Sequence, residues 1–99
     1  MKKIKEYVDA IEEEIEGAKK YAEKAIEYNV AGDSQKSAMF KEMAYDELKH
    51  AKNIHTIAVE EITKLSKVFV PPASMQEQWD KAHKTFIEKS AWVKQMLEM

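Results

Sequence analysis

Turn-forming residues occur at so few places in this chain that they restrict its fold to one class. The sequence contains two glycines and two prolines among 99 residues. An all-β domain of this size would need a turn about every 8–12 residues. The apolar residues instead recur in steps of three and four, which is the spacing of one face of a helix. We therefore expect an all-α protein built from a few long helices.

Two breaks divide the chain into three predicted helices, which together form a single domain over residues 1–99. The helices are expected over about 2–31, 33–68 and 74–97. A short break between two helices of this length implies an antiparallel hairpin with arms about 45 Å long. The second connection is also short, so the third helix should start near the open end of the hairpin.

The residues at the breaks are suited to ending and starting helices. Gly32 tolerates the positive φ that ends a helix, and Asp33 can cap the next helix through its carboxylate. The second helix should end in the segment 68–72, because a residue that precedes proline avoids the helical conformation. Ser74 and Glu77 have the spacing of a capping box and are expected to open the third helix.

Each predicted helix has one apolar stripe, and charged residues interrupt two of these stripes. The stripes comprise Tyr7, Ile11, Ala18, Tyr21, Ala25 and Tyr28 in the first helix, Phe40, Met43, Ile54 and Ile57 in the second, and Trp79, Ala82, Phe86, Val93 and Leu97 in the third. Glu14 lies within the first stripe, and Glu47 and His50 lie within the second. The last two form an E-x-x-H pair on one helix face.

The three interrupting residues are expected to meet at one level of the hairpin. Glu14 lies 18 residues before Gly32, and Glu47 and His50 lie 15 and 18 residues after it. Unpaired carboxylates are unfavourable in an apolar core unless they are neutralised or bind a cation. Two carboxylates and an imidazole therefore indicate a metal site with oxygen and nitrogen ligands. Alternatively, both glutamates reach solvent from the edges of the stripes, and His50 is a hydrogen-bonded core histidine.

These motifs resemble those of the ferritin-like superfamily, which includes rubrerythrins, encapsulated ferritins and small ferritin-like proteins of bacteria and phages. Glu14 matches the glutamate of the first helix, and Glu47 with His50 matches the E-x-x-H of the second. Tyr21, seven residues after Glu14, matches a tyrosine that family members often place there. The resemblance implies that Tyr21 is a hydrogen-bond donor behind the ligands. The resemblance covers roughly residues 4–68 and implies a centre of two irons held by four helices.

The chain carries only half of the ligand set that such a centre needs. The third helix offers only Asp80 and His83, in a loose D-x-x-H that is more simply a pair of surface residues. The resemblance therefore implies that the chain forms a homodimer, or a higher homo-oligomer, and completes a ferritin-like four-helix bundle. Iron is the metal that it implies, although the same ligands suit manganese or zinc.

The resemblance implies a catalytic role for the three ligands Glu14, Glu47 and His50. The expected reaction is oxidation of Fe(II), with reduction of O₂ or peroxide, as in a ferroxidase. The alternative is a non-catalytic interaction or structural module on the same scaffold, with a protein partner bound through the aromatic residues Trp79, Phe86 and Trp92 of the third helix. His55 lies outside the stripe that contains His50 and is read as a surface or interface residue.

Composition excludes several other classes of protein. The 16 basic and 18 acidic residues are interspersed, so no basic stripe indicates nucleic-acid binding. The absence of cysteine excludes disulfides and thiolate metal sites. No run approaches the about 18 apolar residues of a membrane span, and the basic N-terminal residues are not followed by the apolar run of a secretory signal. We therefore expect a cytoplasmic protein.

Overall fold

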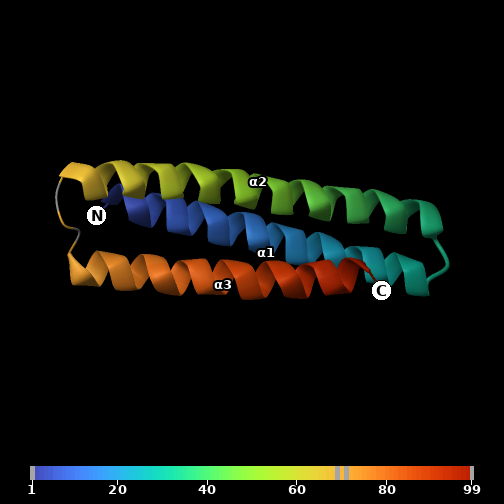
Figure 1. Cartoon of the computed structure of the whole chain (residues 1–99). Helices are drawn as coiled ribbons and strands as arrows, with labels where there is room; N and C mark the ends of the chain where they lie inside the picture. The colour runs from blue at the N-terminus through green and yellow to red at the C-terminus, as the bar shows by residue number, and fades with distance from the viewer. Residues whose placement is uncertain (1, 69, 71, 99) are drawn as a thin grey trace.

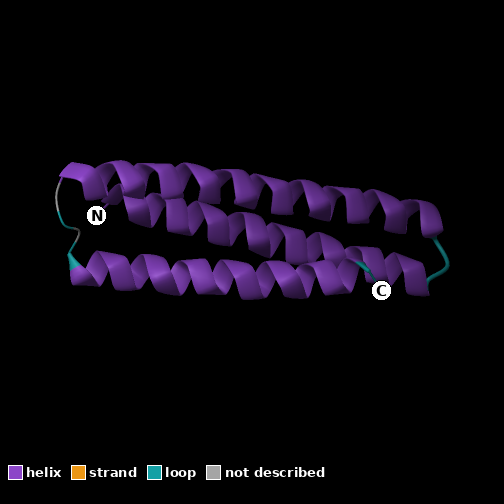
Figure 2. Ribbon diagram, viewed as in Figure 1, coloured by secondary structure: helices purple, strands orange, loops and turns teal. Residues whose placement is uncertain are grey.

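The computed structural model describes residues 2–68, 70 and 72–98, apart from the side chain of residue 2. It consists of three α-helices, α1 (Lys2–Val30), α2 (Ser34–Val68) and α3 (Ala73–Leu97), and contains no strand in the described part (Figures 1 and 2). The molecule is elongated, with extents of 56 × 18 × 17 Å. The prediction of an all-α chain with three helices is confirmed, and each predicted boundary lies within one residue of the observed one.

The helices run up, down and up along the long axis. α1 and α2 form the predicted antiparallel hairpin, and α3 starts at its open end and runs back in the direction of α1 (Figure 1). α3 packs mainly on α1 and makes few contacts with α2. Among the described residues, no helix combines the length and the apolar character needed to cross a membrane.

The turn between α1 and α2 ends one helix and starts the next in four residues. The Asp33 amide donates to the Tyr28 carbonyl at 2.9 Å, and the Gly32 amide donates to the Asn29 carbonyl at 3.1 Å. These are the two hydrogen bonds of a Schellman motif. Gly32 has φ of 84°, a conformation that glycine adopts without steric cost. The Lys36 amide then donates to Oδ1 of Asp33 at 3.0 Å, so Asp33 caps α2 as predicted.

The predicted capping box at the start of α3 is wrong. The helix starts at Ala73, the N-cap position belongs to Pro72, and no side chain caps it. The Pro72 carbonyl accepts bonds from the amides of Met75 and Gln76 at 3.0 and 3.2 Å. Ser74 is therefore already helical and cannot act as the cap. Residues 69 and 71, which belong to the predicted end of α2, lie outside the described residues.

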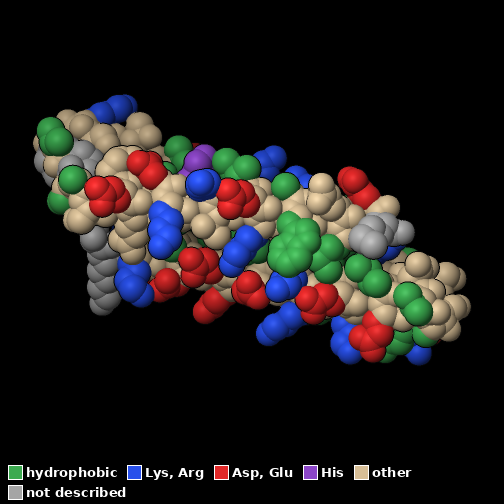
Figure 3. Space-filling view, turned by 90° about the horizontal axis from the view of Figure 1, so that it is seen from below, with side chains coloured by type: hydrophobic (Ala, Val, Ile, Leu, Met, Phe, Trp, Pro, Cys, Tyr) green, Lys and Arg blue, Asp and Glu red, His purple; other side chains and the backbone are tan. Residues whose placement is uncertain are grey.

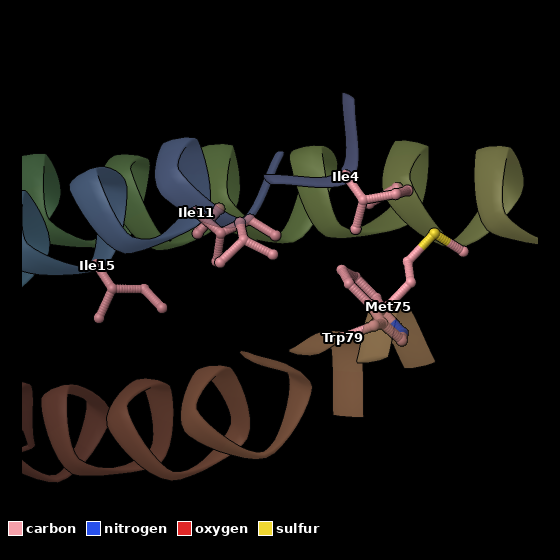
Figure 4. Packing of buried hydrophobic residues seen from close by; sticks show 8 residues of the cluster. Ile4, Ile11, Ile15, Met75 and Trp79 are labelled. Carbon is pink, nitrogen blue, oxygen red and sulfur yellow. The ribbon is translucent and has the colours of Figure 1, made fainter. Parts of the chain in front are cut away.

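All three helices contribute to the core, which lies in two clusters along α1. The first contains isoleucines of α1 together with Met75 and Trp79 of α3, which point toward them in Figure 4. The second contains small residues of α1 and α2 and is closed by Val93 and Leu97. Trp79 is 9 % exposed, so the expectation that it is a surface anchor is wrong. Burial against α1 takes its ring out of reach of any partner.

The surface has charges of both signs and some uncovered apolar residues. On the face shown in Figure 3, seen from the α3 side, acidic and basic side chains alternate over the length of the molecule. In α2, Met39, Met43 and Ile57 remain 58, 39 and 45 % exposed although they belong to its predicted apolar face. α1 and α3 together therefore cover only part of that face, and the uncovered part lies beside Glu47 and His50.

Candidate metal centre

Glu14 of α1 and Glu47 and His50 of α2 come together halfway along the hairpin. One ligand atom of each side chain lies within 4.8 Å of the other two. Nδ1 of His50 is 3.6 Å from Oε2 of Glu14 and 3.9 Å from Oε1 of Glu47. The equal heights inferred from the distances to Gly32 are thus observed, because an antiparallel pair places equal offsets side by side.

The three side chains lie at the edge of the core, on the flank of the hairpin. The side chains of Glu14, Glu47 and His50 are 28, 25 and 54 % exposed. In a single chain the two glutamates therefore reach solvent, as the alternative interpretation of the sequence states. His50 is the most exposed of the three, so the core histidine that this interpretation expects is wrong. The group is open on one side, so a cation placed there would keep coordination positions for water or for ligands from another molecule.

A glycine in α1 makes room for the Glu47 carboxylate. A Cβ atom added at Gly17 would lie 3.0 Å from Oε2 of Glu47, closer than Cβ atoms normally approach another atom. Glycine within a helix costs roughly 0.5–1 kcal/mol relative to alanine. In return for this cost, the Glu47 carboxylate can lie close to the α1 backbone, one turn away from Glu14. The sequence contains Gly17 inside the first predicted helix, but its contact with Glu47 was not foreseen.

The two carboxyl groups share a site that does not favour two negative charges. The pKa of Glu47 is raised, first by its hydrogen bond with Glu14, then by burial and by the negative charge of Glu14, while His50 acts in the opposite direction. Two adjacent carboxylates resist simultaneous ionisation unless a proton or a cation lies between them. The donor set therefore fits a divalent cation with hard oxygen and imidazole ligands.

Tyr21 lies two turns along α1 from Glu14 and packs with aromatic residues. Its ring centroid is 6.1 Å from that of Phe40, which in turn stacks on Tyr28 at 5.5 Å. Within the described part of the chain, no hydrogen bond joins the Tyr21 hydroxyl to Glu14, Glu47 or His50. The role of Tyr21 behind the ligands therefore stays a prediction.

A pair of histidines links α2 to α3, away from the candidate centre. Nε2 of His55 and Nδ1 of His83 are 2.7 Å apart, and the His55 ring stacks on Phe86 at 4.6 Å. The pKa of His55 is lowered, first by burial and then by His83. His55 follows Ala51 by four residues, on a buried face of α2, and this spacing was a signal that it contacts α3.

The remaining predicted residues do not join the candidate centre. Asp80 is exposed and its Oδ1 accepts a hydrogen bond from Gln76 at 2.9 Å. His83, the other residue of the loose D-x-x-H, contacts His55 and not the candidate centre.

Comparison of the chain with protein-family models, with curated proteins and with solved structures gives no match. The ferritin-like resemblance therefore depends on Glu14, Tyr21 and the E-x-x-H pair alone.

Proposed function

We propose that two copies of the chain pair through the α1–α2 flank and form a di-iron carboxylate centre that oxidises Fe(II). The observation that carries the proposal is the convergence of Glu14, Glu47 and His50 on a flank that is open to solvent. Each copy supplies two carboxylates and one imidazole, so two copies supply four carboxylates and two imidazoles. This is the ligand set of the di-iron carboxylate four-helix bundles.

The residues around the three ligands support pairing through this flank. Met43 and Ile57, which precede and follow the ligands along α2, are 39 and 45 % exposed. Tyr7, Phe40 and Ile54 are only partly buried on the same side of the hairpin. Apolar side chains that surround a polar centre are typical of an interface whose core loses its water on association. A twofold axis between the metals would place each ligand set opposite its copy.

In the proposed dimer each ligand has a distinct task. Glu14 would hold one metal as a terminal ligand, Glu47 would chelate or bridge, and His50 would bind through one ring nitrogen. Bound iron supplies one-electron redox chemistry, with O₂ or peroxide as the electron acceptor. The carboxylates favour Fe(III) over Fe(II) because they are hard anionic donors. A cation between them also offsets the charge repulsion between Glu14 and Glu47.

Metal analysis combined with an oxidation assay tests this function. We expect protein from iron-supplied cells to contain about one iron per chain and to speed the aerobic oxidation of Fe(II). The double variant Glu47→Ala, His50→Ala should lose both properties. The matched control Glu42→Ala, Glu60→Ala changes two exposed acids of the same helix and should keep both. A double variant that binds iron as well as the parent chain contradicts the proposal.

The alternative function is a non-catalytic module on the same scaffold, and Trp92, 53 % exposed on α3, is the observation in its favour. Its ring lies under the Lys19 ammonium, 5.1 Å from the ring centroid. Aerobic oxidation of Fe(II) no faster than in buffer would favour this alternative.

A further inference from the structure

An open groove runs between α2 and α3 because both helices pack on α1 more than on each other. Its volume is about 620 Å³. Leu48, Phe86, Ile87 and Ala91 are among the side chains that give it an apolar lining. Ile87 is 52 % exposed, so a large apolar side chain of the groove faces solvent in the single chain.

The charged side chains that line the groove all have one sign. Lys49 and Lys52 lie on the α2 side and Lys94 lies on the α3 side, and no carboxylate of the described residues lines the groove. The whole chain has a formal net charge of −2, so this groove is a basic region of an acidic protein. An occupant with acidic groups along two edges would match both sides of the groove.

The dimensions and one closed end suit a short helix. On α2 the lining extends from Tyr45 to Thr56, about 16 Å, and on α3 from Phe86 to Lys94, about 12 Å. The stacked rings of His55 and Phe86 bridge the two helices at one end. The length of the groove therefore corresponds to about three helical turns.

Small residues on α3 leave space for close approach. Ser90 and Ala91 line the groove, and the buried Ser90 hydroxyl has no hydrogen-bond partner among the described residues. A buried hydroxyl without a partner is unfavourable. The Ser90 oxygen has almost no accessible surface, so the hydroxyl lies beneath the lining of the groove and is not itself a contact for an occupant.

We propose that the groove between α2 and α3 binds an amphipathic helix of a partner protein, with an apolar face and acidic residues on both of its edges. An amphiphile with a single anionic head would use one lysine, whereas the basic residues here lie on both helices that border the groove. An amphipathic helix in an apolar groove matches that distribution. By the helical period, the groove residues of α2 lie opposite Glu47 and His50, so this proposal is independent of the metal centre.

A synthetic helical peptide tests the proposal with the full chain. The probe is a labelled 14-residue peptide with leucine at positions i, i+3, i+4 and i+7 and glutamate on both sides, and its fluorescence anisotropy reports binding. We expect saturable binding to the parent chain. The triple variant Lys49→Glu, Lys52→Glu, Lys94→Glu should bind about tenfold or more weakly. Ile87→Asp, at an exposed position, should also abolish it.

The matched control reverses three exposed lysines elsewhere, Lys20→Glu, Lys64→Glu, Lys67→Glu, and should leave the affinity unchanged. Circular dichroism shows whether each variant keeps its helices. A peptide with lysine in place of glutamate should not bind. Equal affinity for the parent chain and the groove variants would overturn the proposal.

Two further arms separate other occupants. Binding of laurate that depends on the three groove lysines, without binding of the peptide, would assign the groove to a small amphiphile and overturn the proposal. The chain could instead form an oligomer that Ile87→Asp dissociates and that the peptide does not disturb. That result would assign the groove to a second copy and would overturn the proposal as well.

Discussion

Oε2 of Glu47 lies over the α1 backbone at Gly17, 3.0 Å from the position that a Cβ atom would occupy. Alanine at this position removes the conformational cost of a glycine inside a helix, which is roughly 0.5–1 kcal/mol. The same methyl group displaces the carboxylate from α1. A side chain at position 17 should therefore stabilise the helix and at the same time disturb the position of the Glu47 carboxylate.

We expect Gly17→Ala to raise the free energy of unfolding of the metal-free protein by up to about 1 kcal/mol and to weaken metal binding. Chemical denaturation with a chelator present measures the first effect, and metal titration measures the second. Gly32→Ala is the contrasting control. Its φ of 84° makes alanine strained there, so stability should fall while metal affinity stays unchanged. Unchanged metal affinity in Gly17→Ala would show that the position of the Glu47 carboxylate does not depend on Gly17.

The raised pKa of Glu47 predicts that the metal-free site destabilises the protein at neutral pH. A carboxyl group whose pKa is higher in the folded state binds its proton more tightly there, so the contribution of Glu47 to stability is most favourable at low pH and is lost as pH rises through the raised value. Glu47→Gln removes the charge and should raise the melting temperature of the metal-free protein near pH 7. The exposed control Glu42→Gln should not change it.

Glu47→Gln should also abolish metal binding, because an amide is a weak ligand compared with a carboxylate. A Glu47→Gln variant that is less stable than the parent chain at pH 7 would mean that the two carboxyl groups do not repel each other.

The parts of the fold that the sequence predicted are those fixed by nearby residues. Gly32 and Asp33 determine the turn through contacts within five residues, and both roles were predicted. The start of α3 was misread because Ser74 and Glu77 satisfy the capping pattern, while the N-cap at Pro72, two residues earlier, leaves Ser74 already helical. A local pattern fails where a stronger local constraint precedes it.

Contacts between residues far apart in the sequence were predictable only within the hairpin, where the number of residues from the turn gives the height of a residue along the helix. The meeting of Glu14 with Glu47 and His50 follows from their distances to the turn. The spacing of His55 from Ala51 places it on a face of α2 that contacts another helix, but its approach to His83 also depends on the rotation of α3 about α1, which the sequence does not specify. The exposure of Trp79 was misjudged for the same reason, because burial depends on which face of α3 meets α1.

The lowered pKa of His55 predicts a loss of stability in mild acid. The folded chain resists protonation of this ring, because it is partly buried and faces His83, while Lys49, Lys52 and Lys94 line the same groove. The unfolded chain takes up the proton near the ordinary pKa of 6.5. The contribution of His55 to stability should therefore be constant above that pH and become less favourable as pH decreases below it.

His55→Phe keeps an aromatic ring against Phe86 and cannot be charged. Thermal unfolding between pH 5 and 8 should show a smaller dependence on pH in this variant than in the parent chain. His50→Phe is the control at an exposed histidine of the same helix and should leave the decline below pH 6.5 in place. An unchanged slope in His55→Phe would show that the pair does not resist protonation.

The exposed apolar residues beside the ligands provide the test that separates pairing from metal binding. Met43→Glu, Ile57→Glu places two charges on the flank through which two copies are proposed to associate. Both side chains are well exposed in the single chain, so its helices should persist. A charge without a partner at the centre of an interface is strongly unfavourable, so we expect a monomer by light scattering. Because the monomer keeps only three ligands, it should bind iron weakly and oxidise Fe(II) no faster than buffer. A monomeric variant that retains one tightly bound iron per chain would mean that the centre is complete within one copy.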